Sequence, residues 1–241
     1  MVNREEAIKQ LSEAVTTHFE GWKRKITDKQ NHPIPICAAG PGVGKSRLTQ
    51  EGLTLLKNSI SKDTEIHEYL EDALPILISF GSGYSMRDIE SNWSVETVVS
   101  FRILWSCYIP SSHTYGTWIS SCGVSPNTSL TLDSTLEFIA KNKSKKCIYL
   151  GIDEFQEILK QKEQKFRNFI SVLSGVLSSN HSLFLIPVLS GLSYQELTNI
   201  IRSSRGYPVP LSTPYLPLQS ISTIMDSLSI SDREYVNQFF F

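Results

Sequence analysis

The chain has 241 residues, of which 40% are hydrophobic and 20% are charged, and its formal net charge is −1. That length accommodates one large globular domain, or one domain with a small extension. The balanced charge gives no support to direct nucleic-acid binding. Because no apolar window reaches about 18 residues, we also expect no membrane span.

The N-terminus and the cysteines bear on the cellular compartment. Residues 1–10 are charged and polar, so they do not resemble a signal peptide. None of the four cysteines forms a C-x-x-C pair, which suits a reducing compartment. Cys37 and Cys147 lie in apolar runs and are expected to be small core residues. We therefore expect an intracellular protein.

Apolar periodicity predicts alternating helices and strands along the chain. The first half is predicted to contain helices over 4–25, 46–59 and 94–109, strands over 34–38 and 73–80, and a long Ser/Thr/Gly-rich loop over 111–129. The second half is predicted to contain helices over 130–142, 166–178 and 194–203, strands over 147–152 and 183–189, an edge strand over 209–218 and a helix starting in 219–228. This alternation predicts an α/β three-layer sandwich with a mainly parallel central sheet flanked by helices.

The segment 37–46 connects the first predicted strand to the next predicted helix and reads Cys-Ala-Ala-Gly-Pro-Gly-Val-Gly-Lys-Ser. A glycine-rich turn closed by Gly-Lys-Ser between a strand and a helix is typical of a phosphate-binding loop. Its glycines let backbone N–H groups surround phosphate oxygens, and the helix N-terminus adds its dipole. Ala39 departs from the strict pattern, which has glycine there. The predicted nucleotide-binding residues are Gly40, Pro41, Gly42, Val43, Gly44, Lys45, Ser46 and Arg47.

Two adjacent carboxylates, Asp153 and Glu154, directly follow the predicted strand 147–152. An Asp-Glu pair after a strand is by itself a common turn, but together with the upstream loop it indicates nucleotide hydrolysis. Lys45 would reach the β- and γ-phosphates, and Ser46 and Asp153 would hold Mg²⁺. Glu154 would act as the general base that polarises the attacking water.

Other polar residues are weaker candidates. Ser190 closes the next predicted strand and could contact the γ-phosphate, although a turn serine is an equally good interpretation. Arg202 and Arg205 could stabilise a transferring phosphoryl group, in cis or in a neighbouring subunit, and Arg205 is the catalytic candidate. A surface arginine at a helix end is the alternative. Arg102, in the middle of a predicted helix, is expected to be a paired charge at the edge of the core. The chain has no Asn-Lys-x-Asp element for guanine, which favours ATP.

Three segments together resemble a known family. The loop Gly-Pro-Gly-Val-Gly-Lys-Ser, the strand end Ile-Asp-Glu-Phe-Gln and the helical Phe-Arg-Ile-Leu resemble the P-loop ATPase domain of Crinkler-type effectors, which is similar to that of retrotransposon hot spot proteins. The resemblance covers roughly 34–218. It implies an AAA-like or STAND-like P-loop NTPase core, ATP and Mg²⁺ as ligands, and the nucleus or host nucleus as destination, with the cytoplasm as alternative. The nuclease-like domain and full lid that family members often carry are not apparent in this sequence.

These observations combine into an expected organisation and function. We expect an N-terminal helix over 1–30 that packs on the core, a P-loop NTPase core over 31–220 with an insertion around 85–129, and the start of a truncated helical extension over 221–241. The expected function is Mg²⁺-dependent ATP hydrolysis as a motor or switch module. A nucleotide-gated binding module with little turnover is the alternative. The sequence leaves open whether the chain forms a homo-oligomer and whether it binds an unidentified protein or nuclear partner.

Overall fold

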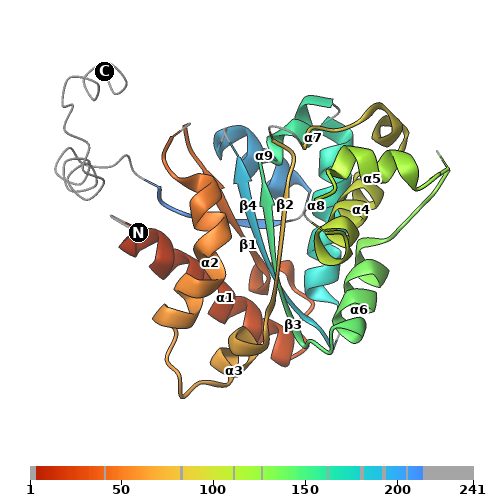
Figure 1. The fold of residues 1–241 in the computed structure, drawn as a ribbon. Helices are drawn as coiled ribbons and strands as arrows, with labels where there is room; N and C mark the ends of the chain where they lie inside the picture. Colours follow the sequence, from red (N-terminus) through yellow and green to blue (C-terminus); the bar gives the residue numbers. More distant parts are fainter. Residues whose placement is uncertain are drawn as a thin grey trace, which may run out of the picture.

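The computed structural model describes residues 4–40, 42–81, 84–110, 112–125, 127–161, 163–179, 182–191, 194–204 and 206–213. Within these ranges five parallel strands form one sheet in the order β2-β3-β4-β1-β5 (Figure 1). The strands are β1 (Pro33–Ala38), β2 (Leu74–Ser79), β3 (Cys147–Asp153), β4 (Phe184–Gly191) and β5 (Tyr207–Pro210). The predicted fold class, a parallel sheet between two helical layers, is confirmed.

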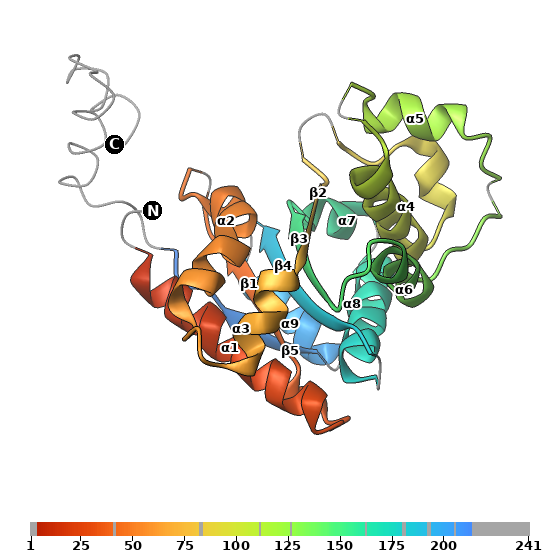
Figure 2. The ribbon, with the colours of Figure 1, turned by 60° about the horizontal axis from the view of Figure 1, so that its bottom comes forward.

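Helices cover both faces of the sheet (Figure 2). One face is covered by α1 (Glu5–Lys23), α2 (Lys45–Ser59) and α3 (Glu65–Asp72), and the other by α4 (Val95–Tyr108), α6 (Leu132–Asn142), α8 (Glu163–Ser178) and α9 (Tyr194–Ser203). The shorter α5 (Tyr115–Ser121) contacts α4, and the shorter α7 (Gln156–Gln161) contacts α8. Two 3₁₀ helices, η1 (Lys29–Asn31) and η2 (Asp88–Asn92), are also present in the described ranges. No helix in the described ranges has the length and apolar character needed to cross a membrane.

The strand sequences explain why both faces are covered. Successive side chains of a strand point to opposite faces, so a continuous apolar run must be buried on both. In β3, Ile148, Leu150 and Ile152 pack into the core beneath α4, α6 and α8. Cys147 and Tyr149 belong to the second core, beneath α1 and α2. Polar groups are thereby left to the strand ends.

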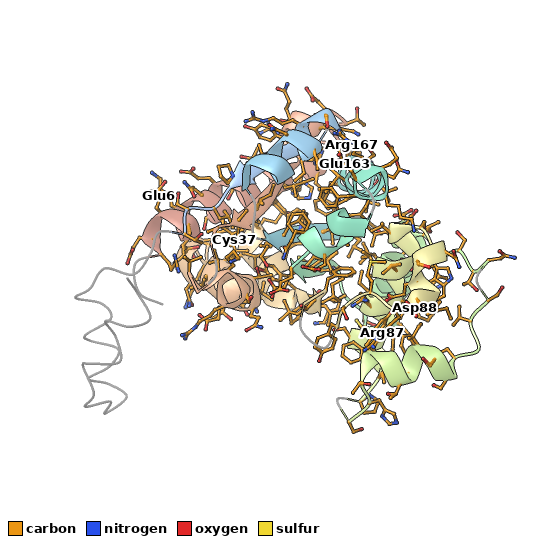
Figure 3. All side chains as sticks on the ribbon, turned by 90° about the horizontal axis from the view of Figure 1, so that it is seen from above. Glu6, Cys37, Arg87, Asp88, Glu163 and Arg167 are labelled. Atoms are coloured by element: carbon orange, nitrogen blue, oxygen red, sulfur yellow. The ribbon has the colours of Figure 1, made fainter. Side chains whose placement is uncertain are left out.

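The two cysteines in apolar runs, Cys37 and Cys147, are both fully buried, which confirms their prediction as core residues. Figure 3 shows Cys37 in the interior, whereas the ion pair between Glu163 and Arg167 lies on the outer surface of α8. Burial raises the pKa of the Cys37 thiol to about 11. The thiol therefore stays neutral at the end of β1, next to the loop that leads to α2.

The strand predicted over 73–80 is β2. Its apolar run is typical of a buried strand, but that expectation is wrong here, because β2 lies at the edge of the sheet and Leu77 is 37% exposed. Helix α4 covers part of this edge. Ser106 Oγ donates to the Leu77 carbonyl at 3.2 Å, and Arg102 Nη1 donates to the Ser79 carbonyl at 2.9 Å. Arg102 also forms a buried ion pair with Glu90 at 2.9 Å, so its interpretation as a paired charge is confirmed.

Short helices and the last strand account for the other differences between the predicted and the observed elements. The predicted loop 111–129 contains α5, whose N-cap Thr114 accepts a hydrogen bond from the Thr117 N–H and whose Tyr115 is 1% exposed. Helices α3 and α7 were not predicted, because few turns leave little periodicity to detect. The edge strand predicted over 209–218 overlaps β5 only at 209–210, because β5 starts earlier, at Tyr207, and ends at Pro210. Residues 214–218 lie outside the described residues. The helix predicted to begin in 219–228 lies outside the described residues.

Candidate functional site

The loop between β1 and α2 has the backbone form that its glycines permit. Gly42 and Gly44 have φ angles of 79° and 82°, in the left-handed region that L-residues with a side chain disfavour. Gly44 is the N-cap of α2, and no side chain caps that helix end. The first-turn N–H groups of α2 are therefore suited to bind an anion. Pro41, one of the predicted loop residues, lies outside the described residues.

Lys45 is enclosed by this loop. Its side chain is only 8% exposed, and its ammonium donates to the Gly40 carbonyl at 2.6 Å. In the described part of the chain, no carboxylate lies within 4.0 Å of that ammonium. A buried cation without an acidic partner is costly. An anionic ligand at the loop would supply the missing charge.

Arg4, which sequence analysis missed, holds the loop from the N-terminal side. It is 4% exposed, and its guanidinium donates to the Val43 carbonyl. A Cβ atom at Gly44 would lie 3.2 Å from Arg4 Nη2, so the guanidinium is packed against the loop backbone. One signal was available in the sequence, because the helix predicted over 4–25 begins at Arg4, a position where the helix dipole disfavours a cation.

The predicted carboxylate Asp153 ends β3, and Ser190 lies near the end of the neighbouring strand β4. Ser190 is fully buried and donates from its hydroxyl to Asp153 Oδ1. In the sheet Ser190 also pairs with Cys37 of β1. Ser190 thus lies between the carboxylate and the strand that leads into the glycine-rich loop, and its hydrogen bond orients the Asp153 carboxylate. A direct contact of Ser190 with a nucleotide stays a prediction.

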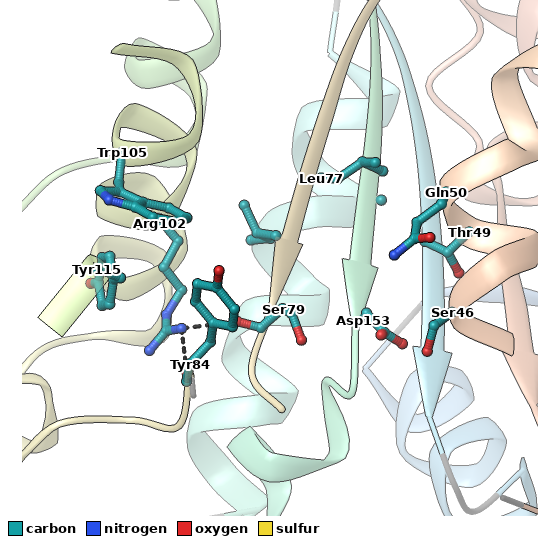
Figure 4. A pocket seen from close by; sticks show the side chains of 12 residues that line it. Ser46, Thr49, Gln50, Leu77, Ser79, Tyr84, Arg102, Trp105, Tyr115 and Asp153 are labelled. Carbon is teal, nitrogen blue, oxygen red and sulfur yellow. Dashed lines mark hydrogen bonds between the residues drawn. The ribbon is translucent and has the colours of Figure 1, made fainter. Parts of the chain in front are cut away.

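A cavity of about 190 Å³ joins the two motifs. Ser46 of α2 and Asp153 of β3 both line it, and Figure 4 shows the Ser46 hydroxyl and the Asp153 carboxylate pointing into the same space. Hydroxyl and carboxylate oxygens are the kind of ligand that Mg²⁺ takes. These two residues therefore fit the Mg²⁺ ion that the sequence motifs predict. On the α4 side the cavity is bounded by Tyr84 and Trp105, whose rings lie 5.5 Å apart.

Glu154 has an unusual backbone. Its φ angle of 52° places a residue with a long side chain in the left-handed region, at a cost of roughly 1–2 kcal/mol. Hydrogen bonds on either side hold this geometry, since the Phe155 N–H donates to the Ser190 carbonyl at 3.2 Å and the Glu157 N–H to the Glu154 carbonyl at 3.1 Å. Such strain persists where the surroundings enforce it, and it is common at functional sites.

Three arginines were candidates from the sequence. Arg47 is exposed and forms an ion pair with Glu51 one turn along α2, at 2.7 Å. Arg202 is exposed near the end of α9. Arg205 lies outside the described residues. The roles of Arg47 in nucleotide binding and of Arg205 in catalysis therefore stay predictions.

Comparisons with solved structures identify the fold. The chain aligns with Orc1 from Aeropyrum pernix, solved in complex with DNA, with a TM-score of 0.50 and 17% identity over 95% of this chain and 50% of that one. This alignment shows the fold alone, the three-layer α/β sandwich with a parallel central sheet described above. A second structure, the Walker-type ATPase PabY2304 of Pyrococcus abyssi, aligns with a TM-score of 0.49 and 14% identity over 98% of this chain and 61% of that one.

Sequence comparison gives a more specific likeness. Crinkler effector protein 108 from Phytophthora sojae is 26% identical over 218 residues, which cover 86% of this chain and 26% of that protein. No protein-family model matches the chain. The chain thus spans about a quarter of the length of its curated relative and half that of the Orc1 chain.

Proposed function

We propose that this protein binds ATP and hydrolyses it in the presence of Mg²⁺. One observation carries the proposal: the cation-bearing phosphate loop and the carboxylate at the end of β3 border the same cavity, through Ser46 and Asp153. A glycine-rich loop alone would support phosphate binding. The adjacent Asp153 and Glu154 extend the proposal to hydrolysis, because they supply a metal ligand and a base.

The residues have distinct roles in the proposed reaction. The loop N–H groups and Lys45 bind the β- and γ-phosphates, and Ser46 and Asp153 would hold the Mg²⁺ ion, which supplies charge neutralisation when bound. Glu154 accepts a proton from the water whose oxygen attacks the γ-phosphorus. The bond between that phosphorus and the β–γ bridging oxygen breaks, so that the products are ADP and inorganic phosphate. Ser190 keeps Asp153 in position throughout.

The biological setting is proposed from the similarity to Crinkler effector protein 108. In this proposal residues 31–220 are the ATPase core, with an insertion around 85–129, and the segment 1–30 contributes the N-terminal helix α1 that packs on it. The helical extension predicted over 221–241 lies outside the described residues. The module acts as a motor or switch within a Crinkler-like effector, in the nucleus or host nucleus. The Orc1 neighbour was solved with DNA. The net charge of −1 in this chain gives no comparable support for DNA binding.

Phosphate release from ATP tests the proposal, with the wild type compared to Glu154→Gln and with Mg²⁺ compared to EDTA. Glu154→Gln keeps the size and backbone of the residue but removes the base. We expect Mg²⁺-dependent release by the wild type and a loss of about 100-fold or more in the variant, while both bind ATP in a thermal-shift titration. If the wild type and the variant both bind ATP and neither releases phosphate above background, the protein is a nucleotide-gated binding module and not an ATPase.

A further inference from the structure

We infer that Gly81 is a positioning residue for the Glu154 carboxylate, an inference that rests on the proposed ATPase function. The contact joins the end of β2 to the first residue after β3. We call the space above the Gly81 Cα atom the Gly81 notch. The notch admits the Glu154 carboxylate only because residue 81 has no side chain.

The geometry of the notch is tight. An ideal Cβ atom built on Gly81 would lie 2.4 Å from Glu154 Oε2, 2.7 Å from Cδ and 3.3 Å from Oε1. Real Cβ atoms essentially never approach another atom within 3.0 Å. The carboxylate therefore occupies the position that any side chain at residue 81 would take.

Both sides of the notch are anchored. On the β2 side, the Phe80 N–H donates to the Asp153 carbonyl at 3.0 Å, and the Gly81 N–H donates to Ser79 Oγ at 3.0 Å. On the β3 side, the left-handed backbone of Glu154 sets the direction in which its side chain leaves the chain. The two backbones are thus fixed relative to one another, and the carboxylate is the part that can yield.

Packing, rather than hydrogen bonding, holds the carboxylate in the notch. Within the described ranges, no donor makes a hydrogen bond to Glu154 Oε1 or Oε2. A general base must lie within hydrogen-bond reach of the water it deprotonates, which makes its position critical. The shape of the notch is therefore what determines where this base lies relative to the cavity bordered by Asp153.

Gly81→Ala is a selective probe of this arrangement. The φ angle of Gly81 lies outside the left-handed range, so alanine is compatible with the backbone. The atoms that must move belong to the far end of a flexible side chain. To restore an ordinary contact of 3.4 Å from 2.4 Å, the carboxylate must shift by about 1 Å. A misplacement of that size can cost on the order of 100-fold in rate.

The experiment measures kcat and KM for phosphate release, together with ATP-induced thermal stabilisation, in the intact chain. For Gly81→Ala we expect kcat to fall by about 10- to 100-fold, with KM, ATP stabilisation and the melting temperature without nucleotide close to the wild type. Gly175→Ala in α8 is the matched control, because a Cβ atom there would have no neighbour within 4 Å. Its kcat should equal that of the wild type.

A double variant separates positioning from general structural damage. If Gly81 acts only through the base, adding Gly81→Ala to Glu154→Gln lowers the residual rate no further. If kcat of Gly81→Ala equals or exceeds that of the wild type, the role of the notch is overturned, while the ATPase proposal stays intact. A further loss in the Glu154→Gln background would also overturn it. Absence of turnover in the wild type itself would remove both proposals.

Discussion

Replacing Glu154 with glycine should make the protein more stable and inactive at once. Glu154 has a φ angle of 52°, which a glycine adopts without steric cost. The same substitution removes the carboxylate that we propose as the general base. If the strained backbone is retained for the sake of catalysis, stability and activity must change in opposite directions at this residue.

The structure allows the magnitude to be worked out. Removing the left-handed strain contributes about 1–2 kcal/mol to the free energy of unfolding. The greater freedom of glycine in the unfolded chain opposes this by about 0.4–1 kcal/mol. The net gain is about 0.8 kcal/mol at the middle of both ranges, within limits of about 0 and 1.6 kcal/mol. For a chain of this size each kcal/mol raises the melting temperature by about 2–4 °C. We therefore expect a rise of about 1–4 °C in the absence of nucleotide.

Thermal unfolding and phosphate release are the assays, and two control variants separate the causes. Glu154→Gln keeps the strained backbone but removes the charge, so it reports how much stability comes from the charge alone. Lys25→Gly relieves a similar backbone angle, φ 56°, at an exposed residue after α1. It should raise stability by a similar amount and leave phosphate release unchanged.

The reasoning would be refuted if Glu154→Gly lowered the melting temperature while Lys25→Gly raised it. It would also be refuted if Glu154→Gln stabilised the protein as much as Glu154→Gly. In that case repulsion between neighbouring carboxylates, and not the backbone angle, would be the source of the instability.

Three further predictions concern the loop, the packing of α2 and the response to acid. Lys45→Ala should abolish the thermal stabilisation that ATP gives, while the melting temperature measured without ATP should stay nearly unchanged. If ATP stabilises the variant as much as the wild type, the assignment of this loop to phosphate binding is contradicted. Gly52→Ala should destabilise by about 1–3 kcal/mol in chemical denaturation, because its Cβ atom would lie 2.1 Å from Tyr149 Oη; a second change, Tyr149→Phe, should restore part of the loss. Burial, followed by the neighbouring His32, lowers the pKa of His18 from 6.5 to about 3. His18 is therefore neutral in the folded state, and stability should fall as pH drops from 6.5 towards 3, by up to about 1.4 kcal/mol per pH unit. His18→Asn should flatten that slope, and an unchanged slope would assign it to other groups.

The sequence by itself determined the parts of this protein that depend on neighbours along the chain. The turn at 37–46 is encoded by its glycines, because the φ angles near 80° at Gly42 and Gly44 are a local requirement. The strand 147–152 and the carboxylates after it were equally predictable, since a continuous apolar run has to be buried on both faces. The parallel α/β class followed from the alternation of such segments.

Only the tertiary structure decided how those segments meet. Strand order places β4 between β1 and β3, so that the Ser190 hydroxyl reaches Asp153, a contact that no local pattern encodes. Arg4 reaches the Val43 carbonyl across 39 residues of chain. Gly81 meets the Glu154 carboxylate because β2 and β3 pair in register, Ser79 beside Asp153. Each of these contacts depends on the positions of residues far apart in sequence, which are set by packing of the whole sheet rather than by the preferences of either residue.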